Sequence, residues 1–174
     1  RHTILQDGSL SEKPIDFQVE AGNGPRHITF NAKGTHAYSI NEMKGTVDVF
    51  SVLQGDLNKI QTIIADTTQT AADHGSGAIQ LSPTGDWLLV SNRVTSDQVV
   101  VFAVQSNGQL VKKHHVEVTK KPRFFRFDKS GKFVLVAGQD ADQVQIFSFD
   151  EVTGKMYLQS TLDIPVPVCI EFFK

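Results

Sequence analysis

Arginine and glutamate recur at matching places along the chain. Arg26 and Arg123 each follow a proline, and Glu42 and Arg93 each follow an asparagine. A guanidinium group can hold a carboxylate or a phosphate through two parallel hydrogen bonds. A glutamate that its surroundings partly desolvate can give or take a proton near neutral pH. Residues of these types could bind a small anion and move a proton on it, provided that the fold brings them together.

Two histidines are further candidates. His27 follows Arg26, so on an extended strand it should point away from whatever Arg26 faces, which favours a packed histidine. His74 lies in a polar loop over 66–76, with Asp73 beside it, and this loop can form part of a rim. The candidate substrate-binding residues are His27, His74, Gln80 and Arg123.

Nothing in the sequence predicts a metal or an organic cofactor. It has no glycine-rich phosphate loop, no paired-cysteine motif and no His-Glu-x-x-His sequence. His114 and His115 are neighbours whose side chains leave a strand on opposite sides, which makes a poor metal chelate. The lone Cys169 is expected to be a small buried hydrophobic residue rather than a nucleophile.

A repeated unit carries these residues. A shift of 51 residues superposes 31–34 (Asn-Ala-Lys-Gly) on 82–85 (Ser-Pro-Thr-Gly), and a shift of 97 superposes it on 128–131 (Asp-Lys-Ser-Gly). Later in each unit comes a Val-Phe or Ile-Phe pair and then a Gly-x-Leu or Gly-x-Met turn. The chain therefore contains three copies of one unit, which is typical of a repeat architecture.

Each unit is predicted to be a meander of four strands. The segments 36–41, 87–92 and 133–138 are nearly continuous apolar runs, as expected where neighbouring sheets cover both faces of a strand. Turn residues separate them from other short runs rich in valine, isoleucine and phenylalanine. Four strands in a unit of this length indicate a β-propeller blade. A β-sandwich also has many short strands, but its strands do not recur with one motif at a fixed offset.

The predicted fold is therefore all-β, a partial β-propeller in a single domain over 1–174. Complete blades are expected at about 25–66, 77–118 and 122–164, and flanking strands at 9–20 and 168–173 bring the expected strands to fourteen. The chain opens on Arg1 with a strand-like run soon after, which suggests a piece of something longer. Because three blades cannot close a ring, a homodimer mate or a second chain with the missing blades is expected to cover the open edges.

Composition narrows the class of partner. The formal net charge is −2, so nothing electrostatic favours nucleic acid or an anionic membrane. One cysteine cannot form an internal disulfide, and the sequence has no signal-like or membrane-spanning apolar run. We expect a cytoplasmic protein that uses neither nucleic acid nor membrane.

The meander places the charged candidates at one end of the blades. A first strand starts, and a second strand ends, at the same end of an up-and-down sheet. Arg26 and Arg123 start first strands, whereas Glu42 and Arg93 end second strands, so all four are expected at one mouth of the central channel. An ion pair between Arg26 and Glu42, with Arg123 as a salt-bridge partner at the rim, is the purely structural alternative.

Several of these motifs resemble those of a known family. They are 24–27 (Gly-Pro-Arg-His), 41–42 (Asn-Glu), 81–85 (Leu-Ser-Pro-Thr-Gly), 90–93 (Val-Ser-Asn-Arg), 122–123 (Pro-Arg), 127–131 (Phe-Asp-Lys-Ser-Gly) and 137–139 (Ala-Gly-Gln). The pattern is similar to that of the seven-bladed lactonase family, which includes propeller-type bacterial 6-phosphogluconolactonases and fungal carboxy-cis,cis-muconate cyclases. The similarity covers essentially the whole chain and corresponds to the C-terminal half of such proteins.

The resemblance implies a hydrolase acting on a small anionic sugar lactone without a cofactor, with Glu42, Arg26 and Arg93 as the catalytic residues. A muconate-type lactonising isomerase is the alternative, because the cyclases use an arginine and a glutamate at the first two of these positions. Their upstream histidine would lie in blades outside this chain. At 77–80 the chain has Gly-Ala-Ile-Gln where bacterial lactonases tend to carry Ala-Asp-Ile-His, so Ala78 and Gln80 replace a carboxylate and an imidazole. A non-catalytic propeller scaffold is the third possibility.

Overall fold

The computed structural model describes residues 1–66, 68 and 74–173. Its strands form three four-stranded antiparallel sheets, each with its strands in chain order. The first sheet holds β1 (Pro25–Phe30), β2 (His36–Asn41), β3 (Thr46–Leu53) and β4 (Asp56–Ile64). The second holds β5 (Ser76–Leu81), β6 (Trp87–Asn92), β7 (Gln98–Val104) and β8 (Leu110–Glu117). The third holds β9 (Pro122–Phe127), β10 (Phe133–Gly138), β11 (Gln143–Phe149) and β12 (Met156–Asp163).

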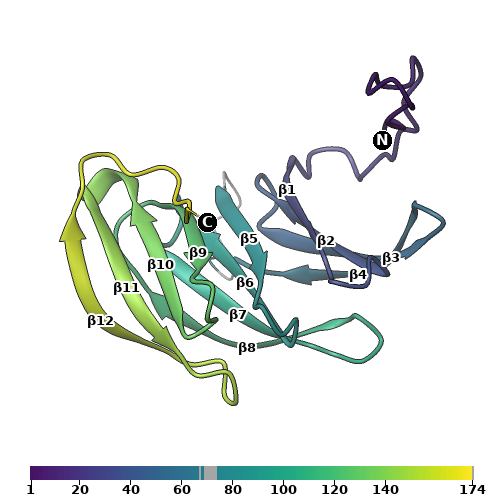
Figure 1. Cartoon of the computed structure of the whole chain (residues 1–174). Coiled ribbons are helices and arrows are strands. Elements are labelled where there is room, and N and C mark those ends of the chain that lie inside the picture. The colour runs from purple at the N-terminus through teal and green to yellow at the C-terminus, as the bar shows by residue number, and fades with distance from the viewer. Residues whose placement is uncertain (67, 69–73, 174) are drawn as a thin grey trace.

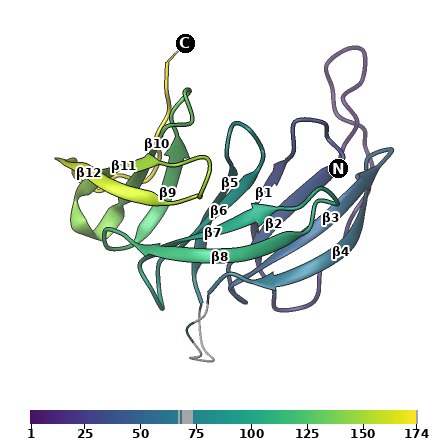
Figure 2. The same ribbon diagram turned by 90° about the horizontal axis from the view of Figure 1, so that it is seen from below.

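The sheets follow one another as the blades of a propeller (Figure 1, Figure 2). Neighbouring sheets meet at their first strands, since β1 contacts β5 and β5 contacts β9. The partial propeller of three four-stranded blades is therefore confirmed. A three-residue 3-10 helix, η1 (Gln139–Ala141), is the one helix in the described part of the chain. Nothing in that part is a helix long and apolar enough to cross a lipid bilayer.

The hydrophobic core lies between the blades. One cluster joins the first and second blades and includes Tyr38, Val49, Leu88 and Phe102. A second cluster, which includes Trp87, Leu89, Phe125 and Phe147, joins the second and third blades. Every residue of β6 is buried, because a blade covers each of its faces. This explains why the segment 87–92 is a nearly continuous apolar run and does not alternate between apolar and polar residues.

Polar side chains reinforce the same interfaces. Gln61 in β4 donates through Nε2 to the Leu110 carbonyl oxygen and accepts through Oε1 from the Leu110 N–H, at 3.0 and 2.7 Å. Trp87 Nε1 donates to the carbonyl oxygen of Glu151 at 2.8 Å. These hydrogen bonds join neighbouring blades and fix the rotation of each sheet against the next.

The flanking strands predicted at 9–20 and 168–173 are absent, so twelve strands form among the described residues instead of fourteen. A strand needs a partner for its backbone hydrogen bonds, and this chain supplies no neighbouring strand for either segment. The N-terminal segment still packs on the first blade, where the ring of Phe17 meets that of Phe50 edge-on at 5.1 Å. Cys169 is exposed rather than buried, because its segment joins no sheet.

The two outer blades each leave an apolar face open. Ile28 and Phe30 in β1 are 48% and 50% exposed, and Tyr157 and Leu162 lie exposed on β12. Apolar side chains of first strands are otherwise packed between blades, as Phe125 of β9 is. The open faces are therefore the surfaces on which further blades would pack.

Candidate functional site

The site begins at an irregularity shared by all three blades. In each first strand the pairing with the second strand slips near its start, which marks a β-bulge. The extra residue is Arg26 in β1 and Arg123 in β9, and in β5 the pair Gly77 and Ala78 lies opposite Ser91. Bulges bend a strand and redirect a side chain, and they are common beside active sites. The repeat thus delivers two arginines, and one position without a side chain, to the same end of the blades.

Glu42 stands between two of the predicted arginines. Its Oε2 lies 3.6 Å from Nε of Arg26, and its Oε1 accepts a hydrogen bond from Nη2 of Arg93. The Arg93 side chain is 9% exposed and that of Glu42 is 32% exposed, so the carboxylate reaches solvent from a largely buried setting. The structure therefore brings together the three residues that were predicted to be catalytic, while their roles stay predictions.

Gly77 makes room for this arrangement, and the sequence reasoning had not singled it out. Its carbonyl oxygen accepts a hydrogen bond from Nη1 of Arg26 at 2.7 Å. A Cβ at this position would lie 3.3 Å from Cδ of Arg93 and 2.7 Å from Oγ of Ser91. Arg93 can cross the first strand of the middle blade because residue 77 has no side chain. The signal was available, since the shift of 51 residues superposes Gly77 on Arg26.

Arg123 adds a third positive charge. Its Nη1 donates to Oε1 of Gln139 at 3.5 Å, and its charge acts on both Arg26 and His27. Burial lowers the pKa of Arg26 most, and the positive charges of Arg93 and Arg123 lower it further, against the opposing effect of Glu42. Arg26, Arg93 and Arg123 together carry three positive charges against the single negative charge of Glu42. An anionic ligand would offset that surplus.

The imidazole of His27 lies against the guanidinium of Arg26, although it was predicted to point away from whatever Arg26 faces. Nη1 of Arg26 is 3.1 Å from Nε2 and 3.4 Å from Nδ1 of His27. The bulge explains the error, because the regular alternation of side chains fails where an extra residue enters the strand. Burial, followed by the charge of Arg26, lowers the pKa of His27 below its ordinary value. These surroundings therefore favour the neutral imidazole.

Two predicted binding residues have contacts elsewhere. Nδ1 of His74 lies 3.4 Å from Oδ2 of the buried Asp66. Oε1 of Gln80 accepts the N–H of Phe127 at 2.9 Å, which ties the second blade to the third. Asp73 lies outside the described residues. The residues that the structure gathers are thus Arg26, His27, Glu42, Arg93 and Arg123.

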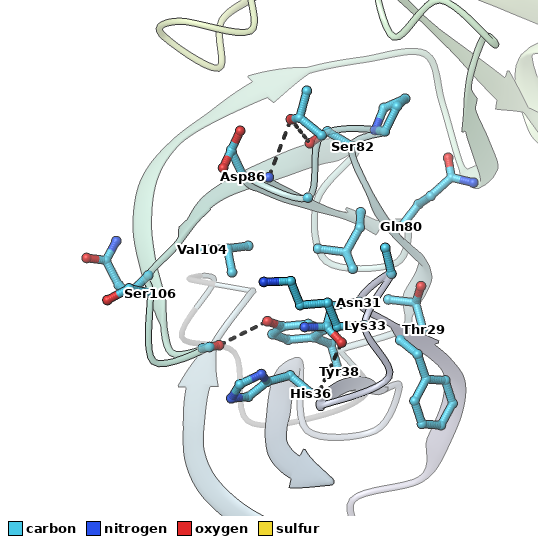
Figure 3. A pocket seen from close by; sticks show the side chains of 18 residues that line it. Thr29, Asn31, Lys33, His36, Tyr38, Gln80, Ser82, Asp86, Val104 and Ser106 are labelled. Carbon is cyan, nitrogen blue, oxygen red and sulfur yellow. Dashed lines mark hydrogen bonds between the residues drawn. The ribbon is translucent and has the colours of Figure 1, made fainter.

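The larger cavity between the first two blades lies away from this cluster of residues. A cleft of about 690 Å³ opens between the first two blades at the opposite end of their strands, lined among others by Lys33, His36, Tyr38 and Asp86 (Figure 3). The hydroxyl of Tyr38 donates across it to the Gly108 carbonyl oxygen at 3.1 Å. A hollow of about 290 Å³ on the open face of the first blade is lined in part by Arg26 and His27. The described residues contain no group of three or more His, Cys, Asp or Glu side chains placed to hold a metal ion.

Comparison with known proteins shows the family of the chain. Residues 2–172 match the family described as lactonase, 7-bladed β-propeller. The chain belongs to this lactonase family. Among its relatives is a 6-phosphogluconolactonase of Formosa agariphila, 36% identical over 148 residues that make up 83% of this chain and 42% of the relative.

Solved structures of the lactonase family superpose closely on the chain. A Bacteroides fragilis protein assigned as a 6-phosphogluconolactonase is 40% identical, with a TM-score of 0.89 over 95% of this chain and 46% of its own. A periplasmic gluconolactonase of Pseudomonas aeruginosa is 34% identical, with a TM-score of 0.84 over 97% of this chain and 46% of its own. The chain therefore spans about half the length of the relatives that it matches.

Proposed function

We propose that this lactonase chain forms part of a propeller that hydrolyses a small anionic sugar lactone, such as a 6-phosphogluconolactone, at the mouth that carries Arg26, Glu42 and Arg93. The observation that supports it is the surplus of positive charge around a single carboxylate. The names of the relatives support the same chemistry. The phosphorylated lactone is favoured over the neutral one because a phosphate brings the negative charge that the arginines lack.

In the proposed reaction Glu42 acts as the general base. A water oxygen attacks the lactone carbonyl carbon while Glu42 takes a proton from that water. Arg93 or Arg26 stabilises the negative charge that develops on the carbonyl oxygen. The tetrahedral intermediate collapses by breaking the bond between the carbonyl carbon and the ring oxygen, and that oxygen receives the proton from Glu42. The product is an open-chain molecule with a hydroxyl group and a carboxylic acid, and the acid then releases its proton to solvent as it becomes a carboxylate.

The proposal includes a partner for the open faces of the outer blades. The exposed side chains of Ile28, Phe30, Tyr157 and Leu162 would pack against the remaining blades of the ring, supplied by another polypeptide or by a second copy of this chain. The cytoplasmic location stays a prediction, since the Pseudomonas relative is periplasmic.

The test is the hydrolysis of 6-phosphogluconolactone and of gluconolactone, followed by proton release at constant pH. The chain is assayed alone and mixed with a polypeptide that carries the missing blades, with Glu42→Gln beside it. We expect faster hydrolysis of the phosphorylated lactone and a loss of about 100-fold or more in Glu42→Gln. Full activity of Glu42→Gln would refute the general base. Absence of hydrolysis in both forms would favour the non-catalytic scaffold, unless a muconate is cyclised in its place.

A further inference from the structure

The first blade buries a carboxylate that the proposed reaction does not use. Asp48 lies in the middle of β3, and its side chain is fully buried. The repeat superposes it on Val100 in β7 and on Gln145 in β11, since each is followed by the recurring Val-Phe or Ile-Phe pair. A carboxylate where an apolar residue would fit is costly to bury unless several donors reach it. Asp48 therefore calls for an explanation that lies outside the hydrophobic core.

Asp48 accepts hydrogen bonds from three side chains. Nδ2 of Asn41 lies 3.0 Å and Nδ2 of Asn23 lies 3.4 Å from its Oδ2, and Oγ1 of Thr62 lies 2.5 Å from its Oδ1. Nζ of Lys59 is 4.0 Å from Oδ1 and supplies a compensating charge. Thr62 belongs to the neighbouring strand β4, whereas the two asparagines lie at the site end of the blade.

The two asparagines connect Asp48 with the arginine and the glutamate of the site. Asn41 immediately precedes Glu42. The carbonyl oxygen of Asn23 accepts the N–H of Met43 at 3.1 Å, and that of Gly24 accepts the N–H of Glu42 at 2.8 Å. The segment that leads into the bulge at Arg26 is thereby clamped to the end of β2. Asp48 contacts both of the clamped segments, through Asn23 before β1 and through Asn41 at the end of β2.

The other two blades can be compared at the position that corresponds to Asp48. In the third blade Oε1 of Gln145 accepts the N–H of Thr119 at 2.7 Å, in the segment that leads to Arg123. In the second blade the bulge carries Gly77, and the corresponding position holds the apolar Val100, buried in the core. A polar side chain at this position of the third strand, Asp48 or Gln145, thus accompanies each bulge that presents an arginine. The second blade has an apolar residue there, and its bulge has glycine in place of the arginine.

We propose that Asp48 is a positioning residue, which fixes the segment before β1 and the end of β2 so that Arg26 and Glu42 meet. Gln145 has the corresponding task for Arg123. The part of this inference that concerns ligand affinity rests on the proposed function, whereas the part that concerns the placement of Arg26 and Glu42 does not.

The test compares Asp48→Val with Thr62→Val in the full chain. Asp48→Val copies the residue of the second blade and removes the acceptor shared by both asparagines, whereas Thr62→Val removes one donor on the side of β4. Binding of 6-phosphogluconate is measured by calorimetry well below the unfolding temperature of each variant. We expect Asp48→Val to bind about tenfold or more weakly, as for the loss of a charged contact, and Thr62→Val to bind within about twofold of the parent. Equal affinities in the two variants would overturn the inference.

A second measurement needs no ligand. The Nε–H resonances of Arg26 and Arg93 in ¹H–¹⁵N spectra report the pairing of these side chains with Glu42. We expect them to shift towards free arginine in Asp48→Val and to stay in place in Thr62→Val, while the dispersed amide signals of the strands show that both variants are folded. Unchanged resonances in Asp48→Val would refute the positioning role. If the parent itself fails to bind 6-phosphogluconate, the proposed function fails, and the spectra still decide the role of Asp48.

Discussion

Replacing Glu42 by glutamine should destabilise the chain, because the positive charges of Arg26 and Arg93 would then repel each other without a carboxylate between them. The amide keeps the size of the side chain but removes the charge that faces Nε of Arg26 at 3.6 Å and the acceptor of Arg93. Two charges about 4 Å apart attract by up to about 4 kcal/mol near a protein surface, and desolvation and solvent screening reduce the net value. Because Glu42 is 32% exposed, we expect the free energy of unfolding to fall by about 1–3 kcal/mol at low ionic strength.

The assay is urea unfolding at rising phosphate concentration. Glu171→Gln is the matched control, because Glu171 also pairs with one arginine, Arg126, but is 66% exposed, and its loss should cost about 0.5 kcal/mol or less. Phosphate should raise the free energy of unfolding of Glu42→Gln by about 1.4 kcal/mol when its concentration is about ten times the dissociation constant of that variant. At the same concentration it should stabilise the parent less. If both variants lose equal stability, or if phosphate acts on both alike, the description of the site as an unbalanced positive cluster is wrong.

Two further predictions concern neighbours of Glu42. Gly77→Ala should displace Arg93 and the Oγ of Ser91, which accepts the Ala78 N–H at 2.9 Å. We expect the free energy of unfolding to fall by about 1 kcal/mol and phosphate to bind severalfold more weakly. Unchanged phosphate affinity in calorimetry would show that Arg93 does not need that space. His27 should titrate below 6.5 in NMR spectra, and Arg26→Gln should raise its pKa. Because the unfolded chain then binds this proton more readily, the free energy of unfolding should fall as the pH drops below about 6.5, and His27→Gln should lack this contribution.

The fold could be predicted because the sequence repeats its turns and apolar segments at fixed offsets. The meander then determined which ends of the strands coincide, and this was sufficient to bring Glu42 next to Arg26 and Arg93. His27 was misplaced because a bulge interrupts the alternation on which its orientation was judged, and no residue type in 24–27 announces a bulge. The segments 9–20 and 168–173 have strand-like sequences, but hydrogen bonding to a neighbouring strand decides whether such a segment becomes one.

The site arises from a difference between copies of one unit. All three first strands begin with a bulge, so a regular propeller would present the same side chain three times around its mouth. Here the outer two copies present Arg26 and Arg123, and the middle copy presents Gly77. An arginine at residue 77 would require the space that Arg93 fills, and it would add positive charge beside a single carboxylate. With glycine at this position, the carbonyl oxygen of residue 77 accepts a hydrogen bond from Arg26, and Arg93 has room to reach Glu42. The chemistry of this mouth therefore depends on the copy that lacks a side chain as much as on the two that carry one.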